Sequence, residues 1–116
     1  PLCLTFKEFK NIELSLKRNS GIRISSNLIL RMVPRFTLLK KKIDEGVLGQ
    51  IYHVEGDYDY GRLEKLLSGW RGNTTNYSVF HGGAIHLLDL LIWLTDFLPY
   101  QVHALGSNFS SFNSCL

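Results

Sequence analysis

The most informative stretch of the chain is residues 81–94, HGGAIHLLDLLIWL. Two glycines lead into a run that is apolar except for His86 and Asp89. A run this apolar predicts a largely buried helix over residues 83–97, which the following Pro99 ends. His86 and Asp89 are three residues apart, so we expect them to share one face of that helix.

His86 is the first candidate for chemistry. Histidine changes its protonation near neutral pH, which suits it to general acid or base catalysis. The alternative is a structural histidine in the core, hydrogen-bonded to a neighbouring carboxylate. A metal site is not indicated, because His81, His86 and Asp89 lack the spacing of four residues between two histidines that a zinc-binding helix uses. We therefore expect no metal.

Local signals predict two further helices. Thr5 and Glu8 have the spacing of a capping box, which begins a helix that the Asn-Ser-Gly of residues 19–21 ends. Pro34 suits the first turn of the next helix, and Gly46 suits its end.

Three segments have the composition of β-strands. Residues 22–30 are apolar and partly β-branched, as in a strand covered on both faces. Residues 51–60 alternate between aromatic or apolar and acidic side chains, as in a half-exposed antiparallel strand, and residues 100–105 are a further candidate. Residues 61–80 are expected to form mostly a loop, of the kind that closes over a ligand. This order of elements predicts an α/β fold.

Composition narrows the class of protein. The 116 residues are 45% hydrophobic and 20% charged, which is typical of a globular domain. Neither G-x-G-x-x-G nor G-x-x-x-x-G-K occurs, so the chain by itself is not expected to bind a nucleotide cofactor. The chain begins at Pro1 and its one methionine is Met32, which favours a piece of a longer protein.

Charge is distributed unevenly along the chain. Residues 1–42 carry ten Lys or Arg against two Glu, a net charge of +8, whereas residues 43–116 carry three basic against eight acidic residues, a net charge of −5. A basic segment can bind nucleic acid, but aromatic residues do not interleave with the basic ones here as they do in such surfaces. We interpret the basic half as solvated helix faces and expect no nucleic-acid partner.

Cysteine usage and hydropathy indicate the compartment. Cys3 and Cys115 form no disulfide framework, which favours a reducing setting. The most apolar run, Ala84–Leu94, is well short of the roughly 20 residues that cross a bilayer. We therefore expect a cytoplasmic protein that does not bind a membrane.

Several segments, taken in order, resemble a known enzyme family. They are Pro1-Leu2, Asn27 with Arg31-Met32-Val33-Pro34, Leu48-Gly49-Gln50-Ile51, Trp70-Arg71, Gly82-Gly83 with His86-Leu87-Leu88-Asp89 and Trp93-Leu94, and Ala104-Leu105-Gly106. Their colinear order is similar to that of the Gfo/Idh/MocA oxidoreductases, which are NAD(P)-dependent dehydrogenases of sugars, polyols and nucleotide-sugars. The resemblance covers nearly the whole chain.

The resemblance implies a two-domain enzyme that this chain contains only in part. Residues 1–30 would be the last helix and strand of a Rossmann domain that binds NAD or NADP, and Pro1 matches the proline of the family's Glu-Lys-Pro motif. Residues 31–116 would begin the substrate domain, an open, mainly antiparallel sheet with helices on one face. The fragment alone would be inactive. The full-length enzyme would act on a sugar-like small molecule and form a homo-oligomer through the open sheet.

The resemblance also implies the catalytic groups. His86 matches the family's acid/base histidine, which takes the hydroxyl proton as the hydride moves to the nicotinamide ring. Asp89 matches a carboxylate one turn later that orients this histidine or binds a substrate hydroxyl. Many members carry an aspartate four residues before the histidine, where this chain has Gly82. His81 could take the place of that missing partner, so we include it in the substrate site.

Four further residues match binding positions of the family. Trp70 and Arg71 match a Trp-Arg pair in the loop that leads to the site, where Arg71 would hold an anionic or hydroxylated substrate. Asn27 and Arg31 match positions near the nicotinamide, so they are the expected cofactor-binding residues. Structural alternatives are a surface ion pair for Arg71 and core packing for Trp70 and Trp93.

A non-catalytic function is the alternative from the residues themselves. The aromatic row along Tyr52–Tyr60 could form an exposed face, and such faces favour protein interfaces. The second hypothesis is therefore an interaction module that dimerises through this face.

Overall fold

The apolar segment found in the sequence forms the central helix of the structure, a computed structural model that describes residues 2–106. This helix, α5 (Ile85–Thr95), follows directly on η2 (Phe80–Ala84), a π-helical turn that contains the two glycines. The chain leaves α5 at Asp96, whose φ of 57° lies in the left-handed region. The predicted helix is thus confirmed, although it ends before Pro99.

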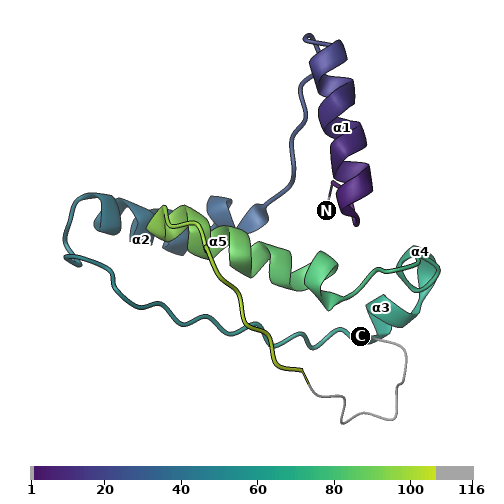
Figure 1. Ribbon diagram of the computed structural model, residues 1–116. Coiled ribbons are helices and arrows are strands. Elements are labelled where there is room, and N and C mark those ends of the chain that lie inside the picture. The colour runs from purple at the N-terminus through teal and green to yellow at the C-terminus, as the bar shows by residue number, and fades with distance from the viewer. Residues whose placement is uncertain (1, 107–116) are drawn as a thin grey trace.

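α5 packs against the helix that Pro34 begins. This helix, α2 (Pro34–Asp44), has Pro34 in its first turn, and the chain turns at Gly46, which has a φ of 73°. Both features agree with the prediction from the sequence. A short 3₁₀ helix, η1 (Ile29–Met32), precedes α2, and both lie against α5 (Figure 1). Leu90 and Leu94 of α5 are buried, with 4% and 7% of their surface exposed.

An ion pair fastens the end of α5 to α2. The Lys40 ammonium group lies 2.6 Å from Asp96 and 2.9 Å from Asp44. Hydrogen bonds to these two carboxylates, the bond to Asp96 foremost, raise the pKa of Lys40 above its ordinary value.

α1 (Phe6–Arg18) stands apart from these helices. The predicted capping box is confirmed: the Thr5 hydroxyl accepts from the backbone N–H of Glu8, and the Glu8 carboxylate accepts from the backbone N–H of Thr5. Among the described residues, α1 packs against none of the other helices, and an extended segment connects it to η1 (Figure 1).

The expected loop over residues 61–80 contains two single helical turns. They are α3 (Glu64–Leu67) and α4 (Gly69–Gly72), which pack on each other. Leu66 of α3 is the third buried hydrophobic residue of the described chain. The loop prediction is therefore only partly correct.

The predicted sheet is wrong for the part of the chain that the structure describes. No strand forms in any of the three predicted segments, which are residues 22–30, 51–60 and 100–105. Residues 29 and 30 belong to η1, and the other residues of these segments lie outside any helix. A strand exists only where its backbone pairs with a neighbouring strand. Within the described residues, no backbone–backbone hydrogen bond involves residues 51–60. The open, mainly antiparallel sheet of the predicted α/β fold is accordingly replaced by an arrangement of helices and extended segments.

The extended segment 51–60 packs on helices instead of on strands. Its Gly56 lies against Leu87 of α5, whose Cδ1 would be 3.1 Å from a Cβ at position 56. Farther along, the rings of Tyr58 and Tyr60 cover Gly83 so closely that a Cβ there would lie 2.8 Å from Tyr58. Side-chain packing on α5 and η2 thus holds this segment.

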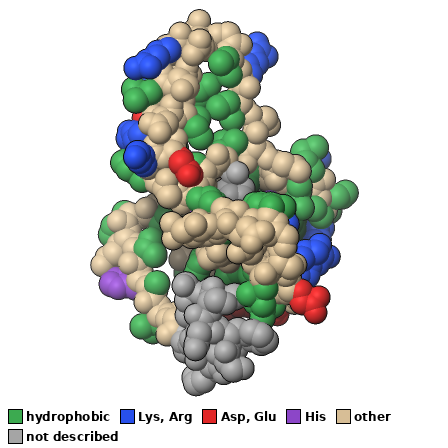
Figure 2. Space-filling view, turned by 90° about the vertical axis from the view of Figure 1, so that its right-hand side faces the viewer, with side chains coloured by type: hydrophobic (Ala, Val, Ile, Leu, Met, Phe, Trp, Pro, Cys, Tyr) green, Lys and Arg blue, Asp and Glu red, His purple; other side chains and the backbone are tan. Residues whose placement is uncertain are grey.

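The described helices bury little surface. The accessible surface is 9912 Å², whereas a compact monomer of this mass exposes about 6,500 Å². The radius of gyration is 17.2 Å, against about 13 Å for a compact domain of this length. Hydrophobic side chains accordingly lie at the surface both on the upper arm, which carries α1, and on the body below it (Figure 2).

Candidate functional site

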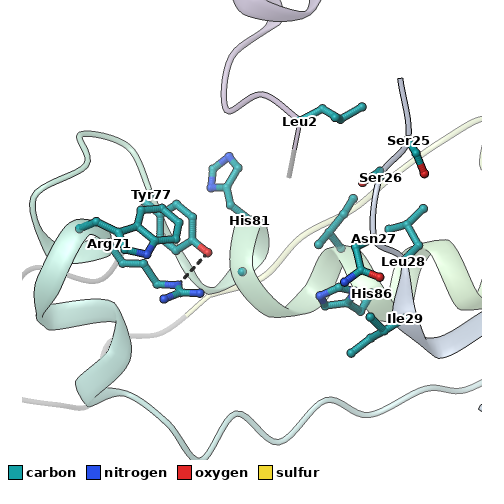
Figure 3. A pocket seen from close by; sticks show the side chains of 13 residues that line it. Leu2, Ser25, Ser26, Asn27, Leu28, Ile29, Arg71, Tyr77, His81 and His86 are labelled. Carbon is teal, nitrogen blue, oxygen red and sulfur yellow. Dashed lines mark hydrogen bonds between the residues drawn. The ribbon is translucent and has the colours of Figure 1, made fainter. Parts of the chain in front are cut away.

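A hollow of about 440 Å³ gathers most of the residues that the sequence singles out. The segment 25–29 lines it from one side and Trp70, Arg71 and Tyr77 line it from another (Figure 3). Leu2, η2 and the first turn of α5 supply the remaining lining residues. Five of the seven expected site residues line this hollow: Asn27, Trp70, Arg71, His81 and His86. Segments that are far apart in the sequence therefore meet at one hollow.

His86 reaches the hollow from the first turn of α5. Asn27 lines the same hollow (Figure 3). The Nδ1 atom of His86 is buried and makes no hydrogen bond within the described residues. A buried polar atom without a partner costs about 1–3 kcal/mol, so few structural histidines keep one. A ligand in the hollow cannot relieve this cost, because Nδ1 itself is enclosed; the acid/base role of His86 stays a prediction that its place in the lining of the hollow supports.

Asp89 does not hydrogen-bond to His86. It accepts two hydrogen bonds from the Arg31 guanidinium group, from Nε at 2.8 Å and from Nη2 at 2.5 Å. The Asp89 side chain is only 11% exposed, and its hydrogen bond raises the pKa of Arg31 above its ordinary value. This bidentate pair links η1 to α5.

Arg31 lies outside the main hollow. It lines a neighbouring one together with Asn27, and its guanidinium group lies 5.8 Å from the centre of the Trp93 ring. The expected cofactor role of Arg31 and the expected catalytic role of Asp89 stay predictions. In the structure, Arg31 and Asp89 are hydrogen-bonded to each other.

Trp70, Arg71 and Tyr77 form one cluster at the wall of the hollow. The Arg71 guanidinium group lies 4.4 Å from the centre of the Trp70 ring, and Arg71 Nε donates to the Tyr77 hydroxyl at 3.3 Å (Figure 3). The edge of one aromatic ring faces the other, with 5.3 Å between the centres of Trp70 and Tyr77. Next to this cluster, His81 Nδ1 lies 3.1 Å from the Ser78 hydroxyl.

The two structural alternatives for the Trp-Arg pair do not fit this geometry. The Trp70 side chain is 59% exposed, so it is not a core residue. Arg71 forms no ion pair with any carboxylate of the described residues. Trp93 is half-buried on α5 near Arg31, which agrees better with a packing role.

Tyr77 is the site residue that the sequence analysis missed. The preceding Asn76 has a φ of 66°, a left-handed conformation that asparagine tolerates and that turns the chain sharply before Tyr77. A Cβ built on Gly82 would lie 2.5 Å from the Tyr77 hydroxyl. The phenol thus occupies the space where a side chain at position 82 would begin, four residues before His86. An aromatic residue within the polar run 73–78 was the signal that could have found it.

The described residues offer no site for a metal ion made of three or more His, Cys, Asp or Glu side chains. No helix among them has both the length and the apolar character needed to cross a membrane. Cys3 is a free thiol, and Cys115 lies outside the described residues.

The Arg31–Asp89 pair gives a testable prediction about stability. Replacing Arg31 by leucine leaves the nearly buried Asp89 carboxylate without its partner, so we expect the free energy of unfolding to fall by about 1–2 kcal/mol. Arg35→Leu is the matched control, because Arg35 makes no ion pair within the described residues. Urea denaturation measures both variants. Equal losses would show that the pair does not contribute.

Comparison with known proteins identifies the family to which the chain is related. Residues 36–113, about two thirds of the sequence, match the family model described as the GFO/IDH/MocA C-terminal domain. No curated protein and no solved structure shows a significant match.

Proposed function

This chain belongs to the GFO/IDH/MocA family, and on that basis we propose that it forms the substrate side of an NAD(P)-dependent oxidoreductase. The proposed reaction moves a hydride between a nicotinamide cofactor and a sugar, a polyol or a nucleotide-sugar. The observation that carries the proposal is the position of His86, whose ring lines a hollow together with Asn27 and Arg71.

We assign the proton transfer to the other ring nitrogen of His86. Because Nδ1 is enclosed, Nε2 is the atom that a substrate hydroxyl can reach. As the carbon–hydrogen bond of the substrate breaks, the hydroxyl proton passes to Nε2 and a carbonyl group forms; in the reverse direction Nε2 returns the proton. When bound, the nicotinamide ring accepts or supplies the hydride.

The residues present fit only one end of that cofactor. Asn27 is exposed and lines the same hollow as His86, and its side-chain amide can both donate to and accept from a carboxamide group. The glycine-rich turn that would hold the pyrophosphate is not in the sequence. We therefore assign the remaining cofactor contacts to the other parts of a Rossmann domain of which this chain supplies only the end, and expect this chain alone to bind NAD(H) negligibly.

The domain division of the chain is part of this proposal. We assign residues 1–30 to the end of the cofactor-binding domain and residues 31–116 to the beginning of the substrate domain. Support comes from the packing: α2 lies on α5, whereas α1 packs against none of the other helices of the described residues. The division falls within η1 (Ile29–Met32), which also lies on α5. In this scheme Trp70, Arg71 and His81 hold the substrate.

Transfer of an isotopic label tests the proposed reaction. The full-length protein is incubated with NAD⁺ or NADP⁺ and with sugars, polyols and nucleotide-sugars deuterated at their secondary alcohol carbons. We expect mass spectrometry to find deuterium in the reduced cofactor with at least one substrate class. If no class transfers deuterium and the full-length protein does not bind either cofactor, the proposed function is wrong.

Self-association is the second candidate. The expected route was an open sheet, which the described residues do not form. What supports association is the apolar surface left exposed, including Tyr52 at 96% exposure. A cytoplasmic location also stays a prediction.

A further inference from the structure

A second hollow adjoins the first one at the reacting end of the site. Its volume is about 510 Å³, and it shares four lining residues with the first hollow: Ile29, Arg71, Gly82 and His86. A ligand that presents a hydroxyl group to His86 can therefore extend from one hollow into the other.

Residues 43–116 are acidic overall, yet all of their basic side chains line this second hollow. Residues 43–116 contain only three basic side chains against eight acidic ones, and all three basic residues, Arg62, Lys65 and Arg71, line the hollow. Of the eight acidic residues, only Asp59 does so. The first hollow has no acidic lining residue at all. The site is thus locally basic within a segment that carries a net charge of −5.

These cations are not neutralised by the rest of the described chain. Arg62, Lys65, Arg71 and Asp59 take part in no ion pair among the described residues. Like charges that face one hollow repel each other, and a concave wall concentrates their field. Binding of an anion would relieve this repulsion.

Arg71 is held in a suitable position for such an anion. The Trp70 ring covers one face of its guanidinium group, and its Nε donates to the Tyr77 hydroxyl. Its terminal nitrogens have no hydrogen-bond partner among the described residues, which leaves that edge for a carboxylate or phosphate oxygen. Tyr77 is then a positioning residue for Arg71.

We propose that the substrate carries an anionic group, a carboxylate or a phosphate, which Arg71 binds together with Arg62 and Lys65 while a hydroxyl of the same molecule faces His86. This inference rests on the proposed function, since it takes His86 as the reacting end. Among the sugars, polyols and nucleotide-sugars of the proposed function, it selects those that carry a carboxylate or a phosphate.

Two pairs of probes test the proposal by equilibrium binding. The full-length protein is titrated calorimetrically with galacturonate against galactose and with glucose 6-phosphate against glucose. We expect at least one anionic member to bind at least about tenfold more tightly than its neutral partner, and the better pair identifies carboxylate or phosphate as the group. Equal affinity within both pairs, or no binding of either anion, would overturn the proposal.

Variants connect that preference to the named residues. Arg71→Gln should weaken the preferred anion by about tenfold and its neutral partner by clearly less, and Arg71→Lys should cause a smaller loss of anion binding because it keeps the charge but not the planar fork. The double variant Arg62→Gln/Lys65→Gln should weaken the anion as well, whereas Arg35→Gln, at a residue that lines neither hollow, should not. If all these variants bind the anion like the parent protein, the anion binds elsewhere and the proposal is wrong.

The outcome separates this inference from the proposed function. If anion binding depends on Arg71 but no hydride transfer is found, the proposed oxidoreductase function is wrong and the anion site is not contradicted. If the protein transfers hydride from neutral sugars and Arg71→Gln does not change that activity, the anionic substrate is wrong and the oxidoreductase function is not contradicted.

Discussion

Replacing His86 by asparagine is expected to lower the turnover number of the full-length enzyme by about a hundredfold or more. Asparagine keeps a polar side chain of similar size in the hollow but cannot exchange a proton with the substrate hydroxyl. The readout is kcat for the substrate found by deuterium transfer. Circular dichroism of the same sample establishes that the variant is folded.

A second histidine provides the matched control for this variant. His53 is exposed and lies outside both hollows, so His53→Asn should leave kcat unchanged. The His86→Asn variant should also retain binding of the preferred anionic probe, because the anion is held by Arg71. Unchanged turnover in His86→Asn would return His86 to a structural role, and the proposed mechanism would be wrong.

Replacing Leu90 by alanine is expected to lower the free energy of unfolding by about 2–4 kcal/mol. Leu90 is the most buried of the three core leucines, with 4% of its surface exposed, and the described residues form only a small core. Truncation leaves a cavity that the packing of α5 on α2 and η1 cannot easily close. Urea denaturation of the protein measures this loss.

The control for Leu90 lies two residues earlier on the same helix. Leu88 is 52% exposed, so Leu88→Ala removes the same atoms from α5 without opening a comparable cavity. We expect it to change stability by no more than about 0.5 kcal/mol. Similar losses in the two variants would contradict the assignment of the core. Because His86 lies one turn before Leu90, loosening α5 should also reduce activity.

The helices were predictable because their signals are local. The capping box of Thr5 and Glu8 acts within one turn, and Pro34 sets the beginning of α2 through its own backbone geometry. The strands were not predictable in this way. Alternation over residues 51–60 indicates an extended segment with two different faces, but a strand also needs a partner for its backbone, and in the described residues α5 and η2 contact this segment instead.

The candidate site likewise combines residues that the sequence indicated with contacts that only the structure shows. The resemblance in the sequence named Asn27, Trp70, Arg71, His81 and His86, and these five residues line one hollow. Spacing alone suggested that Asp89 would accompany His86, because residues three apart share a helix face. The structure pairs Asp89 with Arg31, 58 positions away, since a guanidinium group offers a carboxylate two hydrogen bonds at once.

The sequence by itself determined the ends of α1 and α2, the apolar helix that carries His86, and the family to which the chain belongs. Only the tertiary structure decided that Tyr77 occupies the space beside Gly82 and that the three basic residues of the acidic segment face one hollow. The physical reason is the range of the interactions. Capping and helix periodicity act between residues a few positions apart, whereas the packing of α5 against other segments and the pairing of charges depend on where distant parts of the chain meet.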